Sequence, residues 1–351
     1  MKILVTGNMG YVGPNVVAQL RASYPKSSIM GYDIGFFASN LTNAQIMPEC
    51  MVDLQHFADV RSIPAKLLEG VDAVVHLAAI SNDPMGNKYE EITLDINFRA
   101  SIELAKKAKQ AGVKSFVFAS SCSVYGFAEE GARTEASEVN PLTAYARSKV
   151  YTEQGLADLA DPSFNVTCLR FATACGMSSR LRLDLVLNDF VAGAISSGKI
   201  SILSDGTPWR PLINVKDMAR AIDWAISRDA ALTGPYLIVN AGADEWNYQV
   251  RDLAYSVARA IPGVEVTINP DAQPDKRSYL VSFGLFKRLA PEHQPTHDLS
   301  TTITDLQNAL QAMGFNDPDF RNSGLIRLKV LESLRNSGIV SDELSWAFKA
   351  A

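Results

Sequence analysis

The sequence predicts an α/β protein built on a parallel sheet that helices cover on both faces. Apolar runs of strand length alternate with amphipathic helical stretches through the first half of the 351 residues. These runs are continuously apolar, as expected for strands that are buried on both faces. A glycine-rich turn joins the first strand to the first helix. Together these observations favour a doubly wound sheet.

The first half of the chain supplies the expected sheet. Strands are predicted over 2–7, 28–34, 71–79, 114–121 and 165–176, with one more following the segment 47–55. Helices are predicted over 14–24, 59–70, 91–112 and 140–160. Pro14 falls in the first turn of the first helix, where its missing N–H has no cost.

The regular alternation loosens after Gly176. Amphipathic helices are expected over 183–199, 215–228 and 248–262, short strands over 235–242, 264–270 and 277–283, and a helical tail from 301 to the end. We therefore expect a dinucleotide-binding domain over 1–176 and a smaller mixed α/β substrate lobe over 177–351. Residues of about 212–245 are expected to return to the first domain.

Bulk composition excludes several classes of protein. Hydrophobic residues make up 47% and charged residues 20%, as in an ordinary globular chain. A net charge of −5 without a basic cluster disfavours a nucleic-acid partner. The start, MKILVTG, enters a strand directly and does not resemble a signal peptide. No apolar run reaches the roughly 18 residues of a spanning helix, so we expect a cytoplasmic protein with no membrane contact.

The cysteines and histidines do not suggest a metal site. Cys50, Cys122, Cys168 and Cys175 form no CxxC pair and read as free thiols of a reducing compartment. His293 and His297 are four residues apart, but Pro291 and Pro295 interrupt any helix that would align them. We expect no metal.

The turn VTGNMGYVG predicts a site for a dinucleotide. Its three glycines are spaced by three residues between a strand and a helix, which lets backbone N–H groups approach a pyrophosphate. Asp33 ends the second strand 20 residues after Gly13, the distance expected for a carboxylate that binds the adenosine ribose of NAD. The alternative for Asp33 is a solvated loop carboxylate. No arginine follows closely, so NAD is favoured over NADP.

The stretch YARSK places Tyr145 and Lys149 on one face of a helix. An ammonium group beside a phenol stabilises the phenolate, so this tyrosine could exchange a proton near neutral pH. Taken alone, such a pair is more often a surface contact. The serines of SSCSVYG, at the carboxyl end of a predicted strand about two dozen residues upstream, favour a catalytic interpretation.

In this order and spacing, TGNMGYVG, DVRS, HLAA, SSCSVYG and YARSK resemble the extended short-chain dehydrogenase/reductase family, in its branch of nucleotide-sugar epimerases and dehydratases. The resemblance covers roughly the first 240 residues. It implies a Rossmann-type fold, NAD as cofactor and a nucleotide-diphosphate sugar as substrate. It also implies a homodimer, with helices around 91–111 and 141–160 as candidates for a four-helix interface.

The resemblance assigns the site residues one by one. Ser121, Tyr145 and Lys149 take the catalytic positions, and Asn97 takes the position that supports the active-site helix. The residues implied for the cofactor are Gly7, Gly10, Tyr11, Val12, Gly13, Asp33, Asp59, Val60, Leu77, Ala78, Ala79, Asn97, Tyr145 and Lys149.

The substrate side departs from the family pattern in two places. Cys122 and Ser123 occupy positions where the 4,6-dehydratases carry an Asp-Glu pair, so dehydration is disfavoured. Thr173 stands where an asparagine is usual. The residues expected to meet the substrate are Ser81, Ser121, Cys122, Ser123, Thr173, Arg180, Arg182, Asn188, Arg210, Asp275 and Arg277.

The assignment of the arginines in this set depends on their chemistry as well as on the resemblance. Arg210 matches the family arginine that grips the diphosphate, and a guanidinium group can make bidentate bonds to phosphate oxygens. Arg180 and Arg182 are two residues apart and would project to one side of an extended segment, although a solvated face is the alternative.

The sequence leaves three functions open. The leading one is oxidation at C4 of a nucleotide-activated sugar by a 4-epimerase. The second is a 4-dehydrogenase that releases the 4-keto sugar, because the segments around Arg182 and Arg277 resemble GDP-heptose 4-dehydrogenases. A non-catalytic NAD-binding sensor is the third, and it would have little use for the Ser, Tyr and Lys set.

Overall fold

The computed structural model describes residues 1–81, 83–269, 272 and 278–347. Its centre is a seven-stranded sheet in the order β11-β7-β5-β4-β1-β2-β3, in which every neighbouring pair is parallel. The strands are β1 (Lys2–Thr6), β2 (Ser28–Asp33), β3 (Leu54–Phe57), β4 (Ala73–His76), β5 (Ser115–Ser121), β7 (Asn165–Phe171) and β11 (Tyr236–Ala241). The chain leaves β1 toward one edge and returns to β4 on the other side, which confirms the doubly wound, Rossmann-type prediction.

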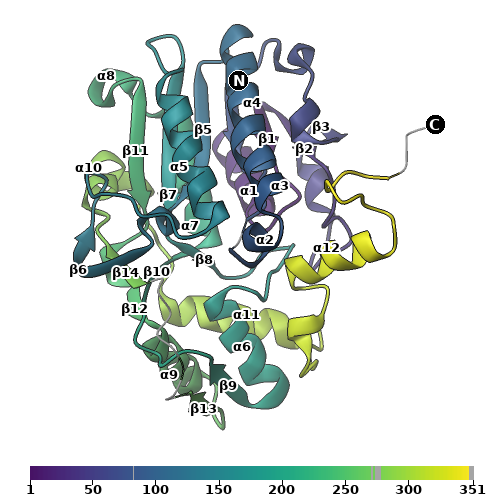
Figure 1. The fold of residues 1–351 in the computed structure, drawn as a ribbon, viewed down its shortest axis with the longest axis vertical. Coiled ribbons are helices and arrows are strands. Elements are labelled where there is room, and N and C mark those ends of the chain that lie inside the picture. Colours follow the sequence, from purple (N-terminus) through teal and green to yellow (C-terminus); the bar gives the residue numbers. More distant parts are fainter. Residues whose placement is uncertain (82, 270–271, 273–277, 348–351) are drawn as a thin grey trace.

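Helices cover both faces of this sheet (Figure 1). On one face, α1 (Gly13–Ser23) packs against α7 (Val215–Ser227), and their apolar residues share a core with the inward-facing residues of β1, β4 and β7. On the other face, α4 (Ala100–Gln110) and α5 (Ala144–Ala157) enclose a second core. Burial on both faces explains why the strands read as continuous apolar runs.

A smaller lobe lies beyond the carboxyl ends of the strands (Figure 1). Helices α6 (Val186–Ser197), α9 (Val250–Ala260) and α11 (Leu299–Ala312) enclose its apolar core. Its short strands are β8 (Thr173–Cys175), β9 (Lys199–Ile202), β10 (Trp209–Asn214), β12 (Asn247–Gln249) and β13 (Glu265–Ile268). Strand β14 (Ser278–Val281) pairs with β6 (Phe127–Arg133). The smaller helices are α2 (Asp83–Lys88), α3 (Glu90–Leu94), α8 (Ala230–Thr233), α10 (Gly284–Leu289) and α12 (Arg327–Asn336).

We propose that the chain divides near residue 176, as the sequence suggests. In support, β11 forms the edge of the large sheet and α7 covers one of its faces, so part of the second half returns to the first domain. The described part of the chain holds no helix of sufficient length and apolarity to span a bilayer.

Four expected elements differ in the structure. The predicted helix at 59–70 is two 3₁₀ turns, Val60–Ser62 and Ala65–Leu68, because Pro64 lacks an N–H and disfavours a helical residue before it. The helix at 91–112 is interrupted by a π-helical segment, Asp95–Arg99. The strand at 165–176 divides into β7 and β8, which join different sheets. The described tail after Asn336, up to residue 347, is not helical, because Gly338 takes a left-handed φ of 71° beyond α12.

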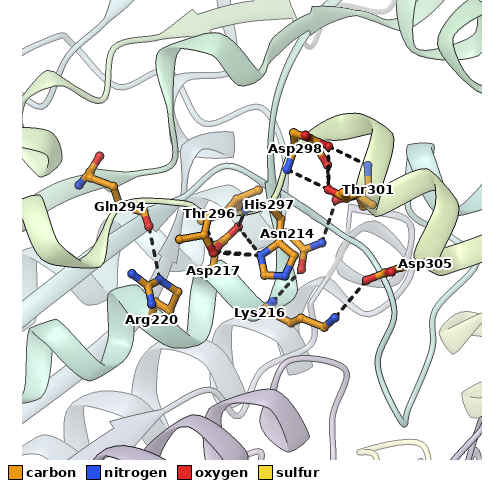
Figure 2. A network of polar contacts seen from close by, with 12 residues as sticks. Asn214, Lys216, Asp217, Arg220, Gln294, Thr296, His297, Asp298, Thr301 and Asp305 are labelled. Atoms are coloured by element: carbon orange, nitrogen blue, oxygen red, sulfur yellow. Dashed lines mark hydrogen bonds and ion pairs between the residues drawn. The ribbon is translucent and has the colours of Figure 1, made fainter.

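A polar network fastens the smaller lobe to α7 (Figure 2). The Asp217 carboxylate accepts bonds from the backbone N–H groups of Thr296 (3.0 Å) and His297 (3.2 Å). Asn214 caps α7 by accepting from the N–H of Lys216 (2.9 Å), and its amide donates to Thr302 in α11 (2.9 Å). These bonds fix the start of α11 against the helix that covers the sheet.

A buried ion pair holds α5 against the sheet. The Arg170 guanidinium on β7 meets both oxygens of Glu153, with Nη2–Oε2 at 2.7 Å and Nε–Oε1 at 3.0 Å, and both side chains are about 95% buried or more. Ser120 donates to the same carboxylate (2.5 Å), and Arg170 also donates to the Tyr125 hydroxyl (3.1 Å). The pair thus joins β5, β7 and α5 at one point.

We predict that Glu153→Gln lowers the free energy of unfolding by about 3 kcal/mol, because it leaves the Arg170 charge buried without a carboxylate. Urea denaturation measures the change. Glu103→Gln is the control, since its ion pair with Lys106 is exposed and should be worth less than about 1 kcal/mol. Equal losses in the two variants would contradict a central role for the buried pair.

Candidate active site

A cavity of about 750 Å³ lies at the carboxyl ends of the strands, between the sheet and the smaller lobe. Its wall includes residues of the glycine turn, the ends of β2, β4 and β5, the first turn of α5, and side chains of the smaller lobe. In open α/β sheets ligands bind at this edge, where the strand order reverses.

The glycine turn between β1 and α1 is too crowded for side chains. Gly7 has a φ of +74°, and a Cβ there would lie 2.5 Å from the backbone nitrogen of Ala78. A Cβ on Gly13 would lie 2.1 Å from the carbonyl oxygen of Asn8. Gly7, Gly10, Tyr11 and Val12 line the cavity, whereas Gly13 lies outside the wall and permits the close packing of helix and turn. This arrangement fits a dinucleotide diphosphate.

The carboxylates and small residues that the sequence predicts for the cofactor site lie beside the glycine turn. Asp33 accepts bonds from the N–H groups of Met9 (3.0 Å) and Gly35 (2.8 Å), and burial raises its pKa. Asp59 caps a 3₁₀ turn through the N–H of Arg61 (2.8 Å) and pairs with its guanidinium (2.6 Å). Both carboxylates border the cavity, as do Val60, Leu77, Ala78 and Ala79.

Helix α5 carries the candidate proton-transfer pair. Its cap, Thr143, accepts from the N–H of Ala146 (3.2 Å), so Tyr145 and Lys149 fall in the first two turns. The Lys149 Nζ lies 5.4 Å from the centre of the Tyr145 ring and donates to the Ala119 carbonyl oxygen (2.7 Å). Burial lowers the pKa of Lys149 to about 7.

The serine-rich end of β5 divides into residues that face the cavity and residues that do not. Ser121 and Ser123 line it, and the Ser121 Oγ accepts from the N–H of Ser123 (3.1 Å). Ser120 also borders the cavity, but its hydroxyl donates to Glu153. Cys122 lies outside the wall, its Sγ 3.1 Å from the Arg170 carbonyl oxygen, and burial raises the pKa of its thiol.

Asn97 supports the catalytic helix from the π-helical segment. Its side chain exchanges two hydrogen bonds with the backbone of Ile80 (2.8 and 2.9 Å) and donates to the Ser148 hydroxyl (3.2 Å). The backbone carbonyl oxygen of Asn97 accepts hydrogen bonds from the hydroxyls of Ser101 and of Thr152 on α5. Asn97 itself is buried and does not line the cavity.

Of the expected substrate residues, Ser81, Thr173, Arg182 and Arg210 line the cavity. Arg182 makes a bidentate pair with Asp184 (2.9 Å for both bonds) and donates to the Ser81 hydroxyl (2.9 Å). The Arg210 Nη1 donates to the carbonyl oxygen of Trp209 (2.9 Å).

Arg180 does not share the surroundings of Arg182, contrary to the expectation that both project to one side. The segment forms turns and bends, not a strand, so the period of two does not apply. Arg180 is fully buried outside the wall and pairs with Glu49 (2.7 Å). Asn188 is also buried outside it, with bonds to Gly176 and Arg182. Asp275 and Arg277 lie outside the described residues.

The cavity wall also contains residues that no motif indicated. They are contributed largely by the loop after β2 and by the C-terminal part of the chain, and include Phe36, Phe37, Asp184, Asp189, Tyr279, Arg321, Arg327 and Leu344. Helix α12 and the loop after β2 are 290 residues apart in sequence, so only tertiary packing brings these side chains to one cavity. Across the described part of the chain, the acidic, histidine and cysteine side chains form no group of three or more that could hold a metal.

We predict that the stability of the ligand-free protein rises with pH relative to that of Lys149→Met. The unfolded chain keeps a proton on Lys149 up to its ordinary pKa near 10.4, whereas the folded protein releases it near pH 7. Between pH 7.5 and 9.5 the difference in unfolding free energy should grow by up to about 1.4 kcal/mol per pH unit. Urea denaturation across this range measures it. Lys106→Met, on an exposed side chain, should show no such slope, and a flat difference for Lys149→Met would contradict the shifted pKa.

Comparison with known proteins agrees with this geometry. The family described as the NAD dependent epimerase/dehydratase family matches residues 3–242. The uncharacterised UDP-glucose epimerase YtcB of Bacillus subtilis is 31% identical over 257 residues, which cover 70% of this chain and 78% of the relative. The UDP-glucose 4-epimerase of Lactobacillus helveticus is 28% identical over 326 residues, covering 86% and 96%.

A solved structure extends the likeness to the fold. TunA, an NAD-dependent NDP-hexosamine 5,6-dehydratase of tunicamycin biosynthesis, superposes with a TM-score of 0.76 at 23% identity, covering 91% of this chain and 99% of that chain. None of these three relatives is named for GDP-heptose, so the local similarity expected from the substrate segments is not shown. The match to the family, over residues 3–242, includes the whole glycine turn, Ser121 and the Tyr145–Lys149 pair. The chain therefore belongs to the NAD-dependent epimerase/dehydratase family.

Proposed function

We propose that this protein oxidises a nucleotide-activated sugar at C4 and completes the reaction as a 4-epimerase. The observation that carries the proposal is the position of Tyr145 and Lys149, one turn apart on α5, beside Ser121 in one cavity. NAD, when bound, supplies the hydride acceptor and donor that such a reaction needs. Gly10, Tyr11 and Val12 would hold its diphosphate, and Asp33 its adenosine ribose.

The chain's own residues move the proton. Tyr145 accepts the proton of the C4 hydroxyl as a phenolate, and Lys149 stabilises that phenolate when it is charged. With a pKa of about 7, Lys149 changes charge near neutral pH. Ser121 accepts from the Ser123 N–H and so keeps its own hydrogen for the substrate oxygen.

The smaller lobe would hold the substrate. Arg210 borders the cavity and has the forked donors that suit a diphosphate, and Thr173 offers a hydroxyl in place of the usual asparagine amide. Arg182 borders the cavity too, with its fork held by Asp184. Two relatives of this chain are named as UDP-glucose epimerases, which makes UDP-glucose the first substrate to test.

Dehydration is disfavoured by the surroundings of Cys122. The 4,6-dehydratases of this family carry a general acid and base at the two positions after the catalytic hydroxyl. Cys122 is buried against the Arg170 carbonyl oxygen with its pKa raised, so its thiol can neither reach the cavity nor ionise readily. Ser123 borders the cavity, but its hydroxyl is a poor acid.

A homodimer is part of the proposal. The four-helix interface would use α5 and α4 with the π-helical segment before it, and Phe98 of that segment makes an edge contact at 5.7 Å with the exposed Tyr151 of α5.

We predict that Tyr145→Phe lowers kcat by about 10²–10⁴-fold, because it removes the group that exchanges the C4 proton. The Kd for NAD should change less than about twofold, as measured by calorimetry. Tyr255→Phe, on the exposed face of α9, is the control and should leave kcat unchanged. An unchanged kcat in Tyr145→Phe would show that another group exchanges the proton, and no turnover by the unaltered protein would favour a binding or sensing role.

Product analysis separates the epimerase from the dehydrogenase. Purified protein is incubated with UDP-, GDP- and dTDP-sugars, absorbance is followed at 340 nm, and the sugars are analysed by mass spectrometry and NMR. We expect an isomer of equal mass without net NADH. A 4-keto product lighter by two hydrogens, with one NADH per sugar, would instead establish the 4-dehydrogenase that releases its ketone.

A further inference from the structure

The C-terminal segment 326–347 forms one side of the cavity. Leu331, Val340 and Leu344 join Met85 and Tyr89 in a separate apolar cluster, with Phe36 and Phe37 packed at its edge. Hydrogen bonds tie the end of the segment to residues that follow β2 and β3: the Trp346 indole donates to the Ile34 carbonyl oxygen (2.8 Å), and Arg61 donates to the Leu344 carbonyl oxygen (3.1 Å). In Figure 1, α12 accordingly lies beside the end of β2. This segment is outside the part of the chain that the family matches.

Arg327, at the start of α12, is a buried cation in this wall. Its side chain is 1% exposed and yet borders the cavity. Nη2 donates to the Arg180 carbonyl oxygen (2.8 Å), and the guanidinium lies 4.4 Å from the centre of the Phe37 ring. Nη1 is buried and has no hydrogen-bond partner among the described residues. A buried, charged donor without a partner is costly, which points to a ligand that supplies the acceptor.

The electrostatic surroundings of Arg327 favour an anion. Burial, together with the nearby guanidinium groups of Arg182 and Arg180, lowers its pKa to about 9. Asp184 and Asp33 act in the opposite direction, with Asp184 acting more strongly than Arg180. Arg182 borders the same cavity but is paired with Asp184, and Arg180 lies behind the wall paired with Glu49. Among the described residues Arg327 has no carboxylate of its own, so an anion with several acceptor oxygens would supply the missing charge.

The contacts of Arg327 place it on the cofactor side of the cavity. Phe37 follows β2, whose last residue is Asp33. The segment 176–180, to which Arg327 donates, lies against the glycine turn: Tyr11 donates to the Gly176 carbonyl oxygen (2.5 Å), and Ser178 donates to the Tyr11 carbonyl oxygen (2.6 Å). Arg327 thus stands between the turn expected to hold a diphosphate and the strand end expected to hold the adenosine ribose.

We propose that Arg327 binds the diphosphate of NAD, so that the C-terminal helix completes a cofactor site otherwise built from the glycine turn. The diphosphate oxygens would accept from Nη1, while the guanidinium stays over the Phe37 ring. Because a charge-assisted bond to a buried donor is strong, this contact also makes release of the cofactor slow, which suits an enzyme that uses the same nucleotide in both halves of a reaction.

Binding measurements on the full-length, nucleotide-free protein test the proposal. Arg327→Met should raise the Kd of NAD and of ADP by about ten- to hundredfold, the loss expected for one charge-assisted hydrogen bond. The Kd of adenosine should change less than about twofold. Lys329→Met is the matched control, because it removes a cation from an exposed position of the same helix and should change none of the three. Calorimetry gives the dissociation constants, so the result does not depend on turnover or on the role of Tyr145.

Two results would overturn the proposal. If Arg327→Met leaves NAD and ADP unchanged but weakens UDP binding to the NAD-saturated protein, the anion belongs to the substrate. If the binding of NAD, ADP and adenosine weakens by the same factor, Arg327 only supports the fold. Should Arg327→Met fail to fold, Arg327→Lys carries the test: it keeps the charge but loses the fork, and should weaken ADP severalfold with adenosine unchanged. Unchanged ADP binding in that variant would also refute the assignment.

Discussion

The buried pair of Glu153 and Arg170 is the interaction on which the rest of the site depends. Tyr145, Lys149 and Glu153 follow one another at intervals of four residues, so they share the face of α5 that meets the sheet. Fixing Glu153 to β7 therefore fixes the rotation of the helix, and with it the two residues one and two turns earlier. Ser120 joins the same carboxylate, which ties the end of β5, and hence Ser121, to the same point.

This arrangement places an amine where the solvent cannot stabilise its charge. Lys149 is 3% exposed, held by one carbonyl oxygen and the faces of two aromatic rings. Burial is the cause of its lowered pKa, and the charge of Glu153 opposes it only in part. A group that is easily charged and discharged near neutral pH is useful beside a tyrosine that must gain and lose a proton, even though its burial costs stability.

The smaller lobe and the C-terminal segment close the cavity from two directions. The bonds of Asp217 and Asn214 fix α11 against the helix that covers the sheet, so the lobe meets the Rossmann core through a defined contact. The C-terminal segment reaches the opposite side and packs on the loop after β2. Side chains from parts of the sequence hundreds of residues apart thereby border one cavity.

The sequence alone determined the parallel sheet and the glycine turn, and its resemblance to a family pointed to the Ser121, Tyr145 and Lys149 set. These depend on local pattern: apolar runs, residues without Cβ where the backbone is crowded, and helical spacing. The tertiary structure decided what local pattern cannot contain. It separated Arg180 from Arg182, turned Cys122 away from the cavity, and brought Arg327 to its wall. An arginine looks the same in sequence whether solvent, a carboxylate or a ligand neutralises it, because its surroundings come from chain segments far away.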